Sequence, residues 1–225
     1  MLAAQTRSTA RFMDFALIIL ALGAVWGFSE VVLGNFLNST GFQYRSALLT
    51  GIGMAAMAVA LVSRKPVYSL LGIALIAVVI KQLGVPLLGV SVMCKANSCL
   101  AVGLEAGGLV GVAAVLGSKM ERSSLVRVAA PAVGAILAAL AFWTLGRHVA
   151  PCNYLLSFSS PGSFLLKEGL AWAMFSAVLF PLGWQFGKWL AAASSEPLRP
   201  AYSLSLLGVA IIGFGASGAS ILSGG

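Results

Sequence analysis

Long apolar stretches dominate this chain and restrict the solvent in which it can fold. Of its 225 residues, 60% are hydrophobic and only 9% are charged. A soluble domain cannot bury that much apolar surface, whereas a lipid bilayer can surround it. The sequence therefore predicts an all-α, polytopic transmembrane helix bundle, forming a single integral membrane domain over residues 1–225.

Runs of about 18–25 mainly apolar residues mark the candidate spans. Lys81, Pro86 and the polar stretch 94–99 interrupt the third and fourth runs, so six and seven spans are both open. A short re-entrant segment around 85–98 is an alternative there. The seven candidate spans are 14–36, 46–62, 67–85, 99–117, 126–146, 165–189 and 203–222.

The basic residues orient the chain. With the N-terminus inside, nine of the 14 lysines and arginines fall on the cytoplasmic side and five on the other. The positive-inside rule then predicts a cytoplasmic N-terminus and, for seven spans, an outer C-terminus. The net charge of +8 follows from this topology and from anionic lipids, and it indicates no nucleic acid. We expect a multi-pass protein of a bacterial or archaeal cytoplasmic membrane.

The few ionisable residues within or at the edge of the spans are the strongest functional signal. They are Glu30, Lys81, Glu105, Lys167 and Glu168. A charge at such a position is costly, so it is a functional-site hypothesis by default. Glu30 lies about 24 Å from the start of its span, in the outer third of the membrane. In the predicted topology the others also lie toward the outer side.

These residues predict an outward-facing pocket for a small polar or zwitterionic molecule, or for a cation. The alternative is structural: an ion pair such as Lys81–Glu105, with lysines that extend toward the headgroups. Trp26 and Trp172 lie near the polar region and could stack on a ligand, although tryptophans near span ends also anchor helices at the interface. The candidate substrate-binding residues are Glu30, Lys81, Glu105, Glu168, Asn35 and Trp26.

Three cysteines, Cys94, Cys99 and Cys152, all fall on the outer side of this topology. A disulfide from Cys152 to Cys94 or Cys99 would tie the connection after the third span to the one after the fifth, over the pocket. A Cys94–Cys99 bridge and free thiols are the alternatives. No metal site is expected, because His148 is the only histidine and no C-x-x-C occurs.

Catalytic motifs give little support for an enzyme. Residues 215–218 read G-A-S-G around Ser217, as in rhomboid-type intramembrane proteases. Those enzymes use a histidine on a later helix, whereas His148 precedes the serine. The chain has no phosphate-binding glycine loop, no H-E-x-x-H and no second histidine for haem. We expect no catalytic residue and no cofactor, and a serine protease is the least favoured interpretation.

Glycines recur at four-residue spacing on two spans. Gly23 and Gly27 form one such pair, and Gly103, Gly107 and Gly111 form a longer series. Small residues let apolar helices approach closely, either within one chain or against a partner. For a membrane protein partner, the face with Gly23 and Gly27 is the better candidate.

The first span carries a smooth face of small residues: Ala16, Ala21, Gly23, Ala24 and Gly27. With the inside N-terminus and the outer polar pocket, this layout resembles the substrate-binding S component of energy-coupling factor transporters. The resemblance implies that helix 1 docks on a transmembrane scaffold subunit. It also implies that two cytoplasmic ATPases drive release of a vitamin or metal ion inside. The alternative function is a non-catalytic membrane subunit of a larger complex.

Overall fold

The computed structural model describes residues 2–63, 66–83, 93–149, 151–193 and 199–222. Within these ranges the chain is helical and has no strand, which confirms the all-α prediction. Five helical stretches are long and apolar enough to cross a membrane: Phe15–Ser39, Arg45–Val62, Ala96–Arg122, Ser124–Val149 and Pro161–Ala192. Two further apolar helices are shorter, Ser69–Gln82 and Gly208–Ala219. The structure is thus a helix bundle of membrane type.

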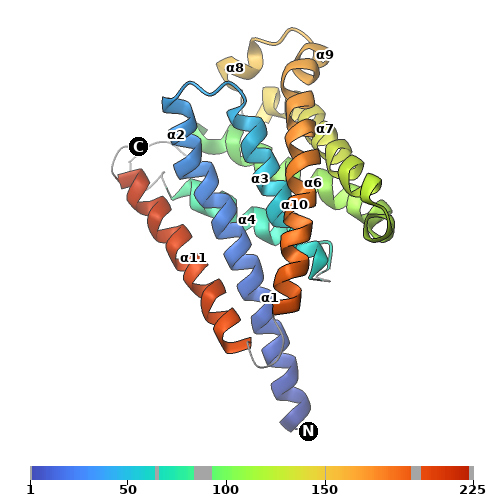
Figure 1. Ribbon diagram of the computed structural model, residues 1–225. Helices are drawn as coiled ribbons and strands as arrows, with labels where there is room; N and C mark the ends of the chain where they lie inside the picture. Colours follow the sequence, from blue (N-terminus) through green and yellow to red (C-terminus); the bar gives the residue numbers. More distant parts are fainter. Residues whose placement is uncertain (1, 64–65, 84–92, 150, 194–198, 223–225) are drawn as a thin grey trace.

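The helices run up and down the bundle in chain order (Figure 1). Helix α1 (Leu2–Phe28) continues through the π-helical turn η1 (Ser29–Leu33) into α2 (Gly34–Ser39). Helix α10 (Leu170–Ala193) is preceded by α9 (Pro161–Phe164) and a second π-helical turn, η2 (Leu165–Gly169). The remaining helices are α3 (Arg45–Val62), α4 (Ser69–Gln82), α6 (Met93–Arg122), α7 (Ser124–Val149), α8 (Asn153–Leu156) and α11 (Arg199–Leu222).

The region of the possible re-entrant segment, 85–98, is only partly described. Residues 84–92 lie outside the described ranges, and from Met93 onward the chain belongs to α6.

Two helix crossings bring backbone against backbone. A Cβ atom added to Gly108 of α6 would lie 2.4 Å from the carbonyl oxygen of Gly134 in α7. A Cβ atom added to Gly183 of α10 would lie 2.2 Å from the carbonyl oxygen of Ala55 in α3. Lipid gives apolar helices no hydrophobic reason to associate, so this close packing is what holds such pairs together.

The small-residue face of α1 is covered within the chain. Cβ atoms at Gly23 and Gly27 would lie 2.5 and 2.6 Å from the side chains of Ile76 and Ile80 in α4. The prediction that Gly23 and Gly27 dock a partner is therefore wrong, because α4 occupies that face. Around the helix, Ala24 is fully buried and packs against α11.

The glycine series of α6 has the opposite environment. Gly103, Gly107 and Gly111 are exposed, and no described atom lies within 4 Å of a Cβ atom built on any of them. Gly108 of α6, which does meet α7 closely, lies outside the series. The four-residue spacing therefore marks an open face on this helix.

Candidate functional site

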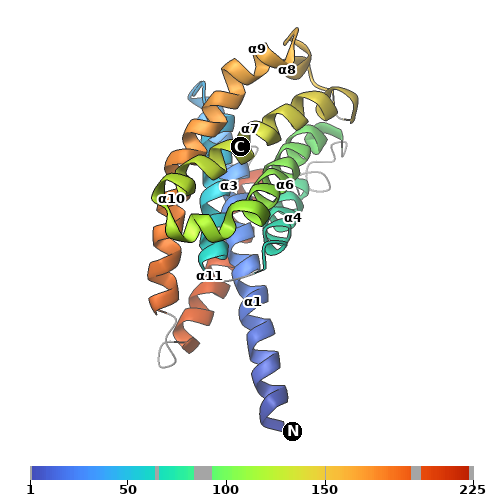
Figure 2. The ribbon, with the colours of Figure 1, turned by 90° about the vertical axis from the view of Figure 1, so that its right-hand side faces the viewer.

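A cavity of about 510 Å³ lies among the helices. The helix ends that line it are far from the N-terminus of α1 (Figures 1 and 2). Elements α2, α3, α4, α6, α7, α8, α9 and α10 contribute to it, together with both π-helical turns. Its size falls within the range of roughly 300–1,000 Å³ that is usual for small-molecule sites. The charged residues that line it are Glu30, Arg45, Lys81, Glu105 and Glu168.

Four of the six predicted substrate-binding residues meet at this cavity: Glu30, Lys81, Glu105 and Glu168. Asn35 is not among the lining residues. Trp26 is fully buried, and its ring packs against Gly53 of α3. The prediction of Trp26 as a ligand contact is therefore wrong, because the ring fills the space between α1 and α3.

Lys167, adjacent to Glu168, is not among the residues that line the cavity. It is exposed, and its ammonium group lies 6.0 Å from the ring centroid of Tyr154 and 5.7 Å from that of Phe158. Such cation–π contacts at an exposed site are weak. Lys167 thus belongs to the outer surface of the α8–α9 region.

Glu30 and Lys81 form an ion pair across α1 and α4. The Lys81 Nζ atom lies 2.5 Å from Glu30 Oε2, and the two side chains are only 9% and 8% exposed. Lys81 thus pairs with Glu30, and the suggested Lys81–Glu105 pair is not the one that forms. A buried pair of this kind is weak evidence for stability, but removal of one partner leaves an uncompensated charge.

Two of the three carboxylates sit on π-helical turns. Glu30 lies in η1, where the Gly34 N–H donates to the Ser29 carbonyl five residues back. Glu168 lies in η2, where the Leu170 N–H donates to the Leu165 carbonyl in the same way. Single π turns inside α-helices are rare and occur frequently at functional sites. Here two π-helical turns, on separate helices, each carry a carboxylate that lines the same cavity.

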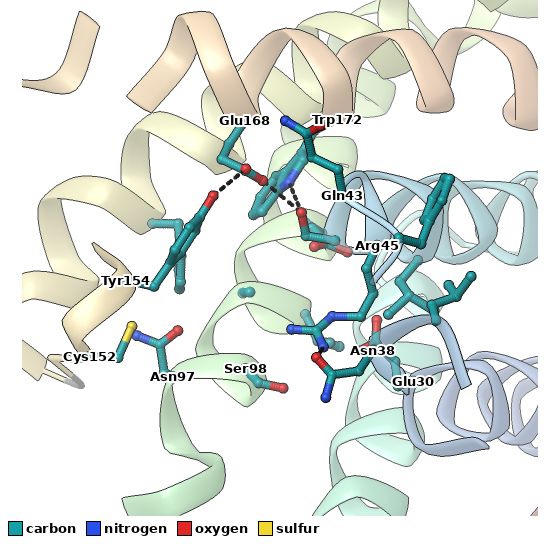
Figure 3. A pocket seen from close by; sticks show the side chains of 18 of the residues that line it. Glu30, Asn38, Gln43, Arg45, Asn97, Ser98, Cys152, Tyr154, Glu168 and Trp172 are labelled. Carbon is teal, nitrogen blue, oxygen red and sulfur yellow. Dashed lines mark hydrogen bonds between the residues drawn. The ribbon is translucent and has the colours of Figure 1, made fainter. Parts of the chain in front are cut away.

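Glu168 is fully engaged by hydroxyl groups (Figure 3). Its Oε2 accepts a hydrogen bond of 2.7 Å from Ser46, and its Oε1 accepts one from the Tyr154 hydroxyl. The Trp172 indole N–H donates to the Ser46 hydroxyl at 3.3 Å and so fixes its orientation. Burial and the bond to Glu168 raise the pKa of Tyr154 above its ordinary value, which keeps Tyr154 a neutral donor.

Glu105 is the most buried of the three carboxylates and the least satisfied. Its side chain is 3% exposed, and its Oε1 accepts a hydrogen bond of 2.9 Å from Thr50. Among the described residues, no group donates to its Oε2. A buried carboxylate oxygen without a partner is costly unless a donor or a cation reaches it.

Aromatic rings form the apolar part of the cavity wall. Phe142, Phe164 and Trp172 contact one another, with ring centroids 5.9–6.4 Å apart. Near Glu30, Arg45 donates a hydrogen bond to Asn38 (Figure 3). The cavity therefore combines carboxylates, amide and hydroxyl groups with one apolar surface, as small-molecule sites commonly do.

Sequence reasoning missed the residues of α3 that complete the site. Ser46 lines the cavity and donates to Glu168, and Thr50, on the same helix face, donates to Glu105. Their spacing of four residues in an apolar span was a usable signal, because residues i and i+4 share a face. Phe142, Phe164, Asn38 and Ser98 also line the cavity and carry no such signal.

The predicted disulfide through Cys152 is wrong. Cys152 has a free thiol and lines the cavity. Cys99 lies on α6 and faces the end of α4, where its sulfur accepts a hydrogen bond of 3.3 Å from Gln82. The side chain of Cys94 lies outside the described residues. Cys99 thus contacts the end of α4.

The serine of the protease-like motif, Ser217, is bonded within its own helix. Ser217 is buried in α11 and donates a 2.6 Å hydrogen bond to the Gly213 carbonyl of its own helix. His148 is exposed in the last turn of α7. Across the described ranges, no three His, Cys, Asp or Glu side chains group in a way that could hold a metal ion.

The structure thus joins carboxylates from three helices, one lysine and an aromatic wall around one cavity at the end of a membrane-type bundle. Compared with protein-family models, curated proteins and solved structures, the chain shows no significant match to any of them.

Proposed function

We propose that this chain is an integral membrane transport protein, or the substrate-capture component of a transporter, that binds a small polar molecule or a cation in the cavity. One observation carries the proposal: Glu30, Glu105 and Glu168, from three separate helices, line the same 510 Å³ space. Intramembrane carboxylates are expensive, and their convergence on a cavity is typical of substrate and ion pathways. No reaction is needed to explain the arrangement.

The proposed cavity faces the outer side of the membrane. The helix ends that line it lie at the opposite end of the bundle from the N-terminus (Figure 1), and the distribution of basic residues predicts an inside N-terminus. Cys152 lines the cavity and reports on this orientation. In a variant with Cys94 and Cys99 replaced by alanine, a membrane-impermeant maleimide should label Cys152 in intact cells. Labelling only after the membrane is opened would place the cavity on the inner side.

Ligand binding is tested by thermal shift on the purified protein with vitamins, amino acids, amines, carboxylic acids and metal ions. A ligand at a hundred times its Kd stabilises the folded state by about 2.7 kcal/mol, well above the detection limit. Blocking Cys152 with a bulky maleimide should abolish that shift, because the thiol lies in the cavity wall. Absence of stabilisation by any compound would contradict a binding role.

The likeness to energy-coupling factor S components belongs to this proposal. It accords with a compact bundle that has one cavity-lining set of polar groups at its outer end. The docking face of that family would have to differ here, because α4 covers Gly23 and Gly27. Co-purification of a scaffold subunit and two ATPases is the result that would support the family assignment.

The second candidate function is a non-catalytic subunit of a larger membrane complex. The open face of α6, with Gly103, Gly107 and Gly111, favours it, because a face without side chains permits close helix approach. Purification in a mild detergent followed by mass spectrometry separates the candidates. Stable partners without ATPases, together with no ligand in the thermal-shift screen, would favour the subunit. A monomer that binds a ligand would favour transport.

A further inference from the structure

We infer that the ligand is an organic monocation, a protonated amine attached to an apolar or aromatic body, and that its ammonium group binds Glu105. This inference rests on the proposed function and names the substrate class of the same cavity. Three independent features lead to it: the charge balance of the cavity, the hydrogen-bonding state of each carboxylate, and the aromatic wall.

The charges that line the cavity do not cancel. Three carboxylates, Glu30, Glu105 and Glu168, face two cations, Lys81 and Arg45, among the described lining residues. Lys81 is committed to Glu30, and Arg45 is exposed and bonded to Asn38. With all five groups ionised, one negative charge has no counter-charge, and a ligand with a single positive charge supplies it. A neutral or zwitterionic ligand would leave the imbalance in place.

The hydrogen-bonding states identify which carboxylate is available. Both oxygens of Glu168 already accept hydroxyl donors, from Ser46 and Tyr154. Glu105 is different: Thr50 holds its Oε1, while its Oε2 is buried and without a described donor. The Thr50 bond fixes the carboxylate, so the second oxygen is preorganised for a donor that comes from the cavity. An ammonium group provides a charge-assisted hydrogen bond at that place.

The aromatic wall favours an organic cation over a metal ion. Hard metal ions take about six or more oxygen ligands. Here Lys81 and hydroxyl groups occupy the other two carboxylates, and the described residues contain no metal-type cluster. Phe142, Phe164 and Trp172 instead give the same cavity an apolar surface for the body of an amine.

The test uses a panel of arylalkyl and alkyl compounds that differ only in the charge of the end group. Each body size is offered as the primary amine, the alcohol and the carboxylic acid, for example phenethylamine, phenethyl alcohol and phenylacetate. Isothermal titration at neutral pH measures binding to the full-length protein in detergent. The variants are Glu105→Gln and, as the matched control, Glu121→Gln, which removes an exposed carboxylate from the same helix. Glu105→Asp keeps the charge and guards against a folding defect in Glu105→Gln.

We expect the wild type to bind amines, with the matching alcohols and acids at least tenfold weaker. Glu105→Gln should weaken amine binding at least tenfold, Glu121→Gln should not change it, and Glu105→Asp should retain part of it. Equal or tighter binding of alcohols or acids, or amine binding unchanged by Glu105→Gln, overturns the inference while the binding function survives. Failure of every compound to bind the wild type overturns the inference, whereas the proposed binding function is overturned only if the wider thermal-shift screen also finds no ligand.

Discussion

Helix α6 changes its surroundings completely within one turn. Glu105 faces the cavity with a free carboxylate oxygen, and Gly108, three residues later, lies against the backbone of Gly134. Helix α3 makes the same change between Thr50, which donates to Glu105, and Ala55, which contacts Gly183. The cavity and the tight helix crossings are therefore built from the same helices. They differ only in which side chains fill the space between backbones.

Because of this contrast, substitutions at the helix crossings and at the cavity should affect the stability of the protein differently. At the crossings, glycines permit backbone contact, and any added side chain must push helices apart. At the cavity, side chains hold polar groups apart and leave space for a ligand. Changes at a crossing should therefore reduce stability, and changes of a satisfied polar group at the cavity should have smaller effects unless they leave a buried charge alone.

The largest effect is expected for Gly108→Leu. A Cβ atom there would lie 2.4 Å from the Gly134 carbonyl oxygen, so α6 and α7 must separate. Because a rotamer change cannot relieve a clash with a backbone carbonyl, the cost should be well above the usual overpacking range of about 1–3 kcal/mol, and it should prevent recovery of monodisperse protein by fluorescence-detected size-exclusion chromatography. Gly107→Leu is the matched control, since no described atom lies within 4 Å of its Cβ position. Equal recovery of both variants would contradict the packing of α6 on α7.

The second largest loss of stability is expected when the buried ion pair of Glu30 and Lys81 is broken. Lys81→Met should destabilise the protein by about 3–5 kcal/mol, because it leaves the Glu30 carboxylate buried and unpaired. The double variant Glu30→Gln/Lys81→Met should regain most of that loss. Lys188→Met, at an exposed position of α10, controls for the loss of one lysine. Thermal unfolding in detergent, followed by tryptophan fluorescence, measures all four proteins. A double variant no more stable than Lys81→Met would show that the two residues do not act as a pair.

A smaller effect is expected for Tyr154→Phe. The change removes one hydroxyl donor to Glu168, and a hydrogen bond to a charged group contributes about 1.5–3 kcal/mol, less at a half-exposed residue. We expect a loss of about 1 kcal/mol in the same unfolding assay. Tyr44→Phe is the control, because Tyr44 is 48% exposed against 50% for Tyr154 and its hydroxyl makes no hydrogen bond to described residues. Identical unfolding of both variants would remove the role given to Tyr154.

The smallest effect is expected for Cys152→Ala. Since Cys152 has a free thiol, its replacement should change stability by less than about 0.5 kcal/mol, as for ordinary surface changes. The melting temperature should also be the same with and without reductant. A loss of a few kcal/mol that appears only without reductant would indicate a disulfide through Cys152.

The sequence by itself determined the class of fold and the chemistry of the site. Apolar runs of sufficient length have few stable structures other than membrane helices, because every backbone polar group must be satisfied within the segment. Glu30, Lys81, Glu105 and Glu168 were identifiable because an ionisable residue in such a run needs a reason to be there. All four line the cavity.

Only the tertiary structure decided which groups pair and which glycines pack. Pairing depends on helix rotation, and the π-helical turns at Glu30 and Glu168 change that rotation without a signal in the apolar pattern. Lys81 pairs with Glu30, and not with Glu105 as the structural alternative had suggested. The same four-residue glycine spacing is covered on α1 and open on α6, because spacing fixes a helix face but not its neighbour.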